Sequence, residues 1–306
     1  MSLRPFTDED AARLKKGFLL TVTASSGGGK SIWVQHLLSM KSMRSRFGAW
    51  VVVSPTSCLS CLDAADEPNQ FACIPRSYHY DLSTHSLPEI LGRIKTTQMK
   101  LRREGRAQEV LLVLDDIFCS VRGAGQNCTA FAEWVSVKRH YFCSVIAIQQ
   151  APKNIAKSIR TQIDGAFFSR PLTYEDRKMV CEWYLCRKSR GTKRATMEHA
   201  SQILDEAFAG SPYAFLYVEA ASKAEEPRDM VRVAIAPSAK PKRFKMRSRR
   251  HLRSRRHPSR RRAKKEGDRV NKEPIEDELL LQVHTEAERG SGDDDDDGTS
   301  WRLDLC

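Results

Sequence analysis

The chain has 306 residues, of which 41% are hydrophobic, and a formal net charge of +13 at pH 7. That apolar content supplies one sizeable α/β core or two small ones. The charge is unevenly spread, because residues 240–265 carry +15 and residues 266–306 carry −10, which leaves +8 for residues 1–239. We therefore expect a globular domain over 1–239, a basic disordered segment over 240–265 and an acidic disordered tail over 266–306.

The sequence argues against a membrane-inserted protein and against an exported protein held together by disulfides. No apolar run approaches the length of about 18–20 residues that a membrane-spanning helix needs, and the N-terminus has no apolar signal-peptide stretch. The nine cysteines show no regular spacing, which favours reduced thiols over a disulfide framework. We expect a protein that is not inserted in a membrane and that stays in cytosol or nucleus.

Apolar segments alternate with amphipathic ones along residues 17–236. The segments that read as strands are 17–24, 49–54, 109–116, 142–150, 164–170, 213–220 and 231–236. Nearly continuous apolar strands between helices are typical of a sheet buried on both faces. The pattern predicts an α/β fold with a mostly parallel sheet flanked by helices.

The strongest motif is SSGGGKS at 25–31, between the first strand and the first helix. A glycine loop in that position exposes backbone N–H groups at the positive end of a helix, where phosphate oxygens bind. Lys30 would reach the β- and γ-phosphates of ATP, and Ser31 would ligate Mg²⁺. The predicted nucleotide-binding residues are Ser25, Ser26, Gly27, Gly28, Gly29, Lys30 and Ser31. Ala24 replaces the first glycine of the usual pattern, and an incidental glycine-rich turn is the alternative interpretation.

A second motif, LLVLDD, ends in Asp115 and Asp116. A carboxylate at a strand end beside a phosphate loop is placed to hold Mg²⁺, so Asp115 is the predicted metal-side residue. Asp116 is the candidate that orients the attacking water. The alternative is that the paired acids only begin a turn. Together the two motifs predict a P-loop NTPase fold of the RecA/ASCE-like kind.

Three further side chains complete the predicted catalytic set. Gln149 and Gln150 end the predicted strand at 142–150, where either amide would sense the γ-phosphate or orient water. Arg160 lies ten residues on and would stabilise transferred charge in its own site or in a neighbour's. Arg122 and Arg170 compete for that role.

SSGGGKS, LLVLDD, the block VIAIQQAPKNIAKSIRTQIDGAFFSR and the later SPYAFLYVEA resemble the FtsK/HerA superfamily, most of all the poxvirus-type genome-packaging ATPases. The resemblance spans about residues 17–220. It implies an oligomeric, ring-forming motor that hydrolyses ATP to move double-stranded DNA into a preformed capsid, with a capsid or portal protein as a partner. It also implies action in a virus-infected host cell, in the nucleus or cytoplasm, or in association with the virion.

The basic segment 240–265 has its own interpretations. Its positive charges without interleaved aromatic residues suit non-specific attraction to the DNA backbone, which weakens steeply with salt. Short runs within it would equally serve as nuclear localisation signals. The third interpretation is a solvated tail kept soluble by its acidic neighbour.

A weaker constellation lies between residues 55 and 88. Cys58-x-x-Cys61 with Cys73 and either His79 or His85 has a spacing that would suit a zinc site. Nine scattered cysteines also produce such a pair by chance. The zinc site stays an open alternative.

Two other functions share part of these signals. Another P-loop DNA motor, such as a helicase or a conjugation-type pump, has the first two motifs and a different substrate. A non-enzymatic nuclear DNA-binding protein would keep a degenerate P-loop core and work through its basic segment. Replacement of Lys30 separates an ATP-dependent motor from the second of these.

Overall fold

The computed structural model describes residues 3–54, 71, 74, 79–80, 82, 85–117, 124–171, 173–186, 193–222, 224 and 226–237. The chain divides into two units, Met1–Phe244 and Lys245–Cys306, and every described residue belongs to the first. The predicted basic and acidic segments lie outside the described residues, and the domain boundary at 239 stays a prediction. Within the described part, no helix has the length and apolar character needed to cross a membrane.

One eight-stranded sheet runs through the described unit, in the order β3-β2-β4-β5-β1-β6-β7-β8. The strands from β1 to β6 are parallel, whereas β7 is antiparallel to both β6 and β8. Their bounds are β1 Leu19–Thr23, β2 Ala49–Val53, β3 His79–Tyr80, β4 Val110–Asp115, β5 Cys143–Gln149, β6 Gly165–Ser169, β7 Ala214–Val218 and β8 Val231–Ile235. The prediction of a mostly parallel sheet is confirmed.

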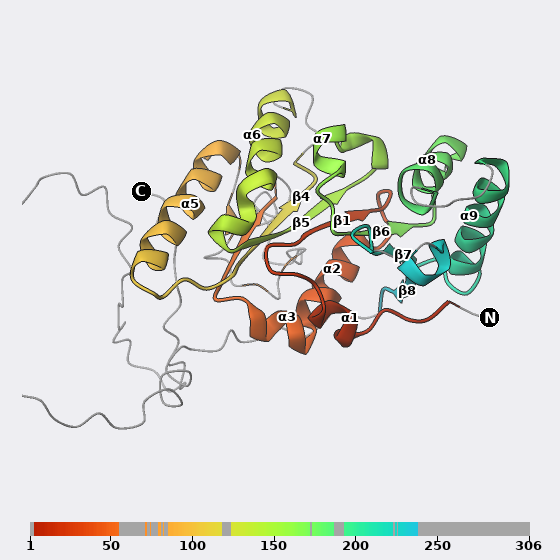
Figure 1. The fold of residues 1–306 in the computed structure, drawn as a ribbon, viewed down its shortest axis with the longest axis horizontal. Helices are drawn as coiled ribbons and strands as arrows, with labels where there is room; N and C mark the ends of the chain where they lie inside the picture. The colour runs from red at the N-terminus through yellow and green to blue at the C-terminus, as the bar shows by residue number, and fades with distance from the viewer. Residues whose placement is uncertain are drawn as a thin grey trace, which may run out of the picture. The chain divides into compact units, whose positions relative to one another are not determined.

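Helices cover both faces of this sheet (Figure 1). One face carries α1 Asp8–Ala12, α2 Lys30–Ser39 and α3 Lys41–Arg46, and the other carries α5 Leu87–Arg103, α6 Ala124–Val137, α7 Lys157–Arg160, α8 Tyr174–Val180 and α9 Lys193–Phe208. Single turns of 3₁₀-helix lie at Lys138–Tyr141, Pro152–Asn154 and Pro227–Met230, and a π-helical turn at Cys181–Leu185 continues α8. Helix α8 begins with a side-chain cap, because the Thr173 hydroxyl accepts a hydrogen bond from the N–H of Asp176.

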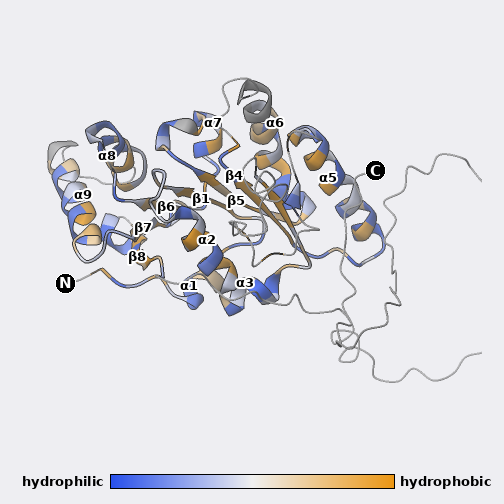
Figure 2. Cartoon of the chain, turned by 180° about the vertical axis from the view of Figure 1, so that it is seen from behind, coloured by the Kyte–Doolittle hydropathy of each residue, from blue (hydrophilic) through white to orange (hydrophobic). Residues whose placement is uncertain are grey.

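The core lies between the sheet and these helices, and the strands are apolar along their length (Figure 2). Trp33 of α2 is 1% exposed and packs against Phe167 of β6 and Phe215 of β7. This contact fixes α2, and with it the loop before α2, against the sheet. Trp33 is therefore a packing residue of α2.

Three side chains from in or just before other strands of the sheet hold the amino end of β1. The N–H of Gly17 donates to Glu109 Oε1 at 2.9 Å, that of Phe18 to Ser144 Oγ at 3.2 Å, and that of Leu19 to Asp164 Oδ2 at 2.9 Å. Glu109 precedes β4, Ser144 lies in β5 and Asp164 precedes β6. Three successive backbone N–H groups at the amino end of β1 thus have side-chain partners.

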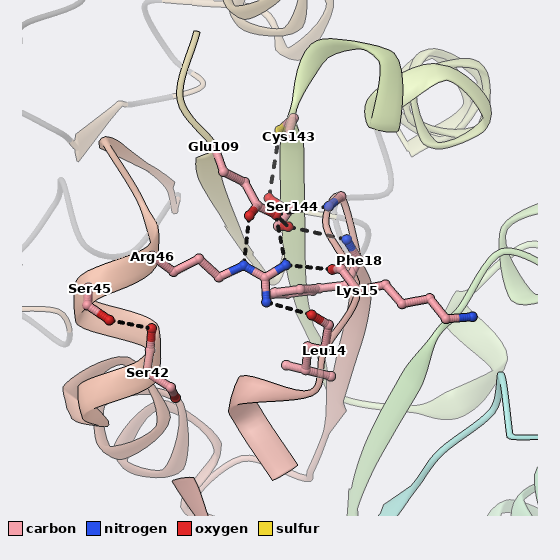
Figure 3. Close-up of polar contacts among 10 residues, drawn as sticks. Leu14, Lys15, Phe18, Ser42, Ser45, Arg46, Glu109, Cys143 and Ser144 are labelled. Atoms are coloured by element: carbon pink, nitrogen blue, oxygen red, sulfur yellow. Dashed lines mark hydrogen bonds and ion pairs between the residues drawn. The ribbon is translucent and has the colours of Figure 1, made fainter. Parts of the chain in front are cut away.

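Glu109 also forms a nearly buried ion pair. Figure 3 shows Arg46, at the end of α3, reaching Glu109 and the carbonyl groups of Leu14 and Lys15. The Arg46 Nε–Glu109 Oε2 distance is 2.7 Å. A charge-assisted pair with several hydrogen bonds is among the stronger polar contacts in proteins. It joins α3 to the start of β4, so the helix layer and the sheet are fixed at this end.

Candidate functional site

The predicted phosphate loop connects β1 to α2, and its glycines adopt backbone conformations that other residues rarely take. Gly27 and Gly29 have φ of 73° and 79°, in the left-handed region. Gly29 is the N-cap of α2, and Lys30 and Ser31 are the first two residues of the helix. The loop therefore leads directly into the N-terminal N–H groups of α2, which favours an anion.

The surroundings of Gly28 and Ala24 explain why alanine replaces the first glycine of the usual pattern. A Cβ at Gly28 would lie 3.0 Å from the Ser25 carbonyl oxygen and 3.1 Å from the Ala24 methyl. Ala24 is itself buried and has no positive φ, so alanine fits at that position. The three glycines next to Lys30 are the ones that the loop conformation requires.

Asp115 ends β4 at the carboxyl edge of the sheet and is 2% exposed. Its Oδ2 accepts a hydrogen bond of 3.0 Å from the Ser54 hydroxyl, and Ser54 directly follows β2. Burial, and next the neighbouring Asp116 carboxylate, raise the pKa of Asp115 from 3.8 to about 6. A cation at this position would remove that electrostatic penalty.

Asp116 has a φ of 51°, a left-handed conformation that aspartate tolerates better than most residues. Its Oδ2 lies 3.4 Å from Lys30 Nζ and accepts a hydrogen bond of 3.2 Å from the Gln150 amide. The turn at Asp116 therefore aims its carboxylate at the phosphate loop. The structure brings together the lysine of one motif and the second acid of the other.

Gln149 is the last residue of β5, which lies between β1 and β4 in the sheet. It pairs in register with Thr23 at the end of β1, and its amide donates to the Thr23 hydroxyl at 2.8 Å. Gln149 is 1% exposed, whereas Gln150 is exposed. The two glutamines therefore occupy different positions, one inside the site and one at its rim beside Asp116.

Acceptor atoms without partners mark the centre of this edge. Asp115 Oδ1, Asp116 Oδ1 and Gln149 Oε1 are buried and have no hydrogen-bond partner in the described structure. Buried acceptors without partners are rare in native proteins and call for an explanation such as an ion or a ligand. Carboxylate and amide oxygens are the ligands that Mg²⁺ prefers. The residues present fit a magnesium–nucleotide complex.

The arginines predicted to stabilise charge have different surroundings. Arg160 ends α7, and its guanidinium lies 3.6 Å from the ring centroid of Trp183 in the π-helical turn. Arg170, directly after β6, is exposed. Arg122 lies outside the described residues. The role of Arg160 in charge stabilisation stays a prediction.

The suggested zinc site falls mostly outside the described residues, because Cys58, Cys61 and Cys73 are not among them. In the described ranges, no group of three or more His, Cys, Asp or Glu side chains is arranged to hold a metal ion. Of the other cysteines, Cys143 and Cys181 are buried and Cys186 is half-buried.

Two polar residues of the site, Ser54 and Thr23, were not predicted from the sequence. Ser54 holds Asp115, and Thr23 holds Gln149. Both stand at the carboxyl end of an apolar strand segment, as Asp115 and Gln149 do. That shared position at the ends of parallel strands was the available signal, because such ends meet at one edge of the sheet.

No protein-family model matches this chain, and no curated protein matches it in sequence. Among solved structures, the fold is similar to B204, the DNA-packaging ATPase from Sulfolobus turreted icosahedral virus, with a TM-score of 0.47 and 11% identity over 72% of this chain and 98% of that one. It is also similar to B204 of Sulfolobus turreted icosahedral virus 2, described as a genome packaging NTPase in complex with ATP-gammaS, with a TM-score of 0.45 and 12% identity over 72% and 98% of the two chains.

A third similar structure is the cytoplasmic domain of the Thermomonospora curvata type VII secretion ATPase EccC, with a TM-score of 0.44 and 12% identity over 72% of this chain and 25% of that one. The sheet order, the glycine loop between β1 and α2, and the acids at the end of β4 are those of a P-loop NTPase fold.

Proposed function

We propose that this chain is a Mg²⁺-dependent ATPase that couples hydrolysis to movement of double-stranded DNA, in the packaging of a viral genome. The observation that carries the ATPase part is the convergence of the phosphate loop, the Asp115–Asp116 pair and Gln149 at one sheet edge. Three buried acceptor atoms there have no partner within the described protein. A site with this donor and acceptor set suits phosphoryl transfer.

Each residue has a role that follows from its position. The loop N–H groups and Lys30 bind the phosphates, while Ser31 and Asp115 hold Mg²⁺, which neutralises charge on the phosphate oxygens. Lys30 lies against Asp116 in this structure. When phosphates compete for Lys30, that contact loosens and leaves the Asp116 carboxylate to orient water. Gln149, held by Thr23, presents its carbonyl oxygen to the same space.

The DNA part of the proposal rests on the resemblance of residues 17–220 to packaging motors and on the charge of residues 240–265. A segment that carries +15 attracts the DNA backbone without reading sequence. We infer a homo-oligomer, in ring form, with a capsid or portal partner, acting in an infected cell. Arg160 would then serve its own site or a neighbouring subunit's.

Hydrolysis of ATP, measured with and without duplex DNA, tests this proposal. Lys30→Ala and Asp115→Ala should each lower DNA-stimulated turnover by about 100-fold or more. Lys100→Ala is the matched control, because Lys100 is an exposed lysine on α5. It should leave turnover unchanged.

Other outcomes assign a different function. Unwinding of a forked duplex would favour a helicase. DNA binding that survives Lys30→Ala, is lost on deletion of 240–306 and occurs without any turnover would favour the non-enzymatic DNA-binding protein. Turnover that Lys30→Ala leaves intact would contradict the assignment of the phosphate loop.

A further inference from the structure

An exposed aromatic ring borders the phosphate loop on the side away from the acids. Tyr213 directly precedes β7, which is antiparallel to β6, so its position coincides with the carboxyl end of β6. A Cβ built on Gly29 would lie 3.6 Å from Cδ1 of Tyr213 and 3.7 Å from the methyl of Ala236. The Tyr213 ring is thus an immediate neighbour of the loop residue that caps α2.

Exposure distinguishes Tyr213 from the aromatic residues next to it. Phe215 lies two residues further along the strand, on the same face of the sheet, and is fully buried against Trp33. Tyr213 is 53% exposed. Its backbone is fixed, because its carbonyl accepts from the N–H of Ala236 at 3.0 Å and its N–H donates to the Ser211 hydroxyl at 3.2 Å. The ring is presented to solvent from a fixed position.

The order of the strands gives the nucleotide a direction. Asp115 and Gln149 end β4 and β5, on one side of β1, whereas β6 and β7 lie on the other side. The phosphate that is transferred belongs beside the acids and the metal. The other end of the molecule, with its ribose and base, therefore leaves the loop toward β6 and β7, where Tyr213 lies.

We infer that the Tyr213 ring is the platform on which the base of the bound nucleotide stacks. This inference rests on the proposed nucleotide site. Stacking uses the face of a base and does not read its hydrogen-bonding edge, so the platform does not distinguish adenine from guanine. The substrate class at this site is a nucleoside triphosphate, with ATP and GTP held alike by this contact.

Binding measured with and without a base tests the platform. In the full chain with Mg²⁺, Tyr213→Ala should raise the Kd of ATP and of GTP about tenfold, the size expected when one base loses its stacking partner. Inorganic tripolyphosphate, which offers phosphates alone, should bind within about twofold of the unaltered chain. Tyr213→Phe keeps the ring and should bind all three ligands normally.

Three controls make the result specific. Tyr174→Ala removes another exposed tyrosine, 76% exposed at the start of α8, and should change no Kd. Thermal unfolding of Tyr213→Ala shows whether the variant is folded. Comparing the ATP Kd of Tyr213→Phe with that of Tyr213→Leu repeats the test with side chains that both retain bulk.

The remaining outcomes overturn one idea or the other. If Tyr213→Ala weakens tripolyphosphate as much as ATP, the ring supports the loop and does not bind the base. If no Kd changes while Lys30→Ala abolishes binding of both ligands, the ring has another role, such as contact between copies of the chain. If Lys30→Ala leaves ATP and tripolyphosphate bound, the proposed nucleotide site itself is wrong.

Discussion

The two ends of the parallel strands differ in how fully their polar groups are satisfied. At the amino end of β1, three successive N–H groups have side-chain partners, and the Glu109 carboxylate is paired with Arg46. At the carboxyl end, Asp115, Asp116 and Gln149 each keep one buried oxygen without a partner. A satisfied network stabilises the fold, whereas unmet acceptors are available to a ligand. Changes at the two ends should therefore alter different observables.

The largest effect on stability is expected from Glu109→Ala at the amino end. Removing one partner of a buried pair leaves the other charge uncompensated, and Gly17 also loses its acceptor, which together should cost about 3–5 kcal/mol of unfolding free energy. Urea unfolding measures this loss. Glu104→Ala, which breaks an exposed pair with Arg106, should change stability by less than about 1 kcal/mol. Equal effects from the two variants would contradict a stabilising role for the buried Glu109–Arg46 pair.

Asp115→Asn at the carboxyl end should have the opposite effect on stability. Because burial raises the pKa of Asp115 to about 6, its charged form disfavours folding at pH 8, and the neutral asparagine should stabilise the unliganded protein by on the order of 1–3 kcal/mol. ATP turnover should nevertheless fall by about 100-fold or more. Urea unfolding and turnover of the same sample check both. A variant that is destabilised and inactive would indicate a structural role for Asp115.

The pH dependence of that stabilisation gives a sharper comparison. The folded-state pKa of Asp115 lies above its ordinary value of 3.8, so the folded state holds this proton more tightly. The unfolding free energy of the unaltered protein therefore falls as pH rises from about 4 through 6. Above that range Asp115 causes no further change. The advantage of Asp115→Asn should be complete at pH 8 and shrink to about half at pH 5. An advantage that stays constant over this range would exclude titration of Asp115 as its cause.

Much of the fold was predictable, because parallel strands that are buried on both faces consist of continuous apolar residues. The glycine loop was predictable for a similar reason, since a lysine and serine after three glycines suit few structures other than a phosphate loop. The direction of β7 was not, because hydrophobic pattern does not encode the direction in which a strand pairs. The sequence therefore left open which end of that strand lies beside the loop.

The less predictable parts of the site depend on contacts between distant residues. Glu109 and Asp164 precede apolar runs and resemble ordinary surface acids, and only the assembled sheet shows that they hold the start of β1. Arg160 has the charge expected of a catalytic arginine, but its position over Trp183 depends on the packing of α7 against the π-helical turn. The sequence places Tyr213 at the start of a predicted strand, and only the structure shows that its ring lies beside Gly29.

The smallest expected effect concerns the two glutamines, whose roles the sequence left open. Gln149 is buried and held by Thr23, and its free carbonyl oxygen lies inside the site. Gln150 is at the rim and contacts Asp116. Gln149→Ala should therefore lower kcat by about tenfold or more, the scale of a lost polar contact to the reacting groups. Gln150→Ala should lower kcat only about two- to fivefold, which is the effect expected from the loss of one weak hydrogen bond.

A double-variant measurement decides whether Gln150 acts through Asp116. Asp116→Asn keeps a residue that tolerates the left-handed conformation and removes only the charge. If Gln150 works by holding that carboxylate, adding Gln150→Ala to Asp116→Asn should lower kcat no further, because coupled residues are not additive. Gln149→Ala, which acts through Thr23 and the buried site, should still lower kcat in the same background. An additive loss from Gln150→Ala would instead give Gln150 its own contact with the reacting groups.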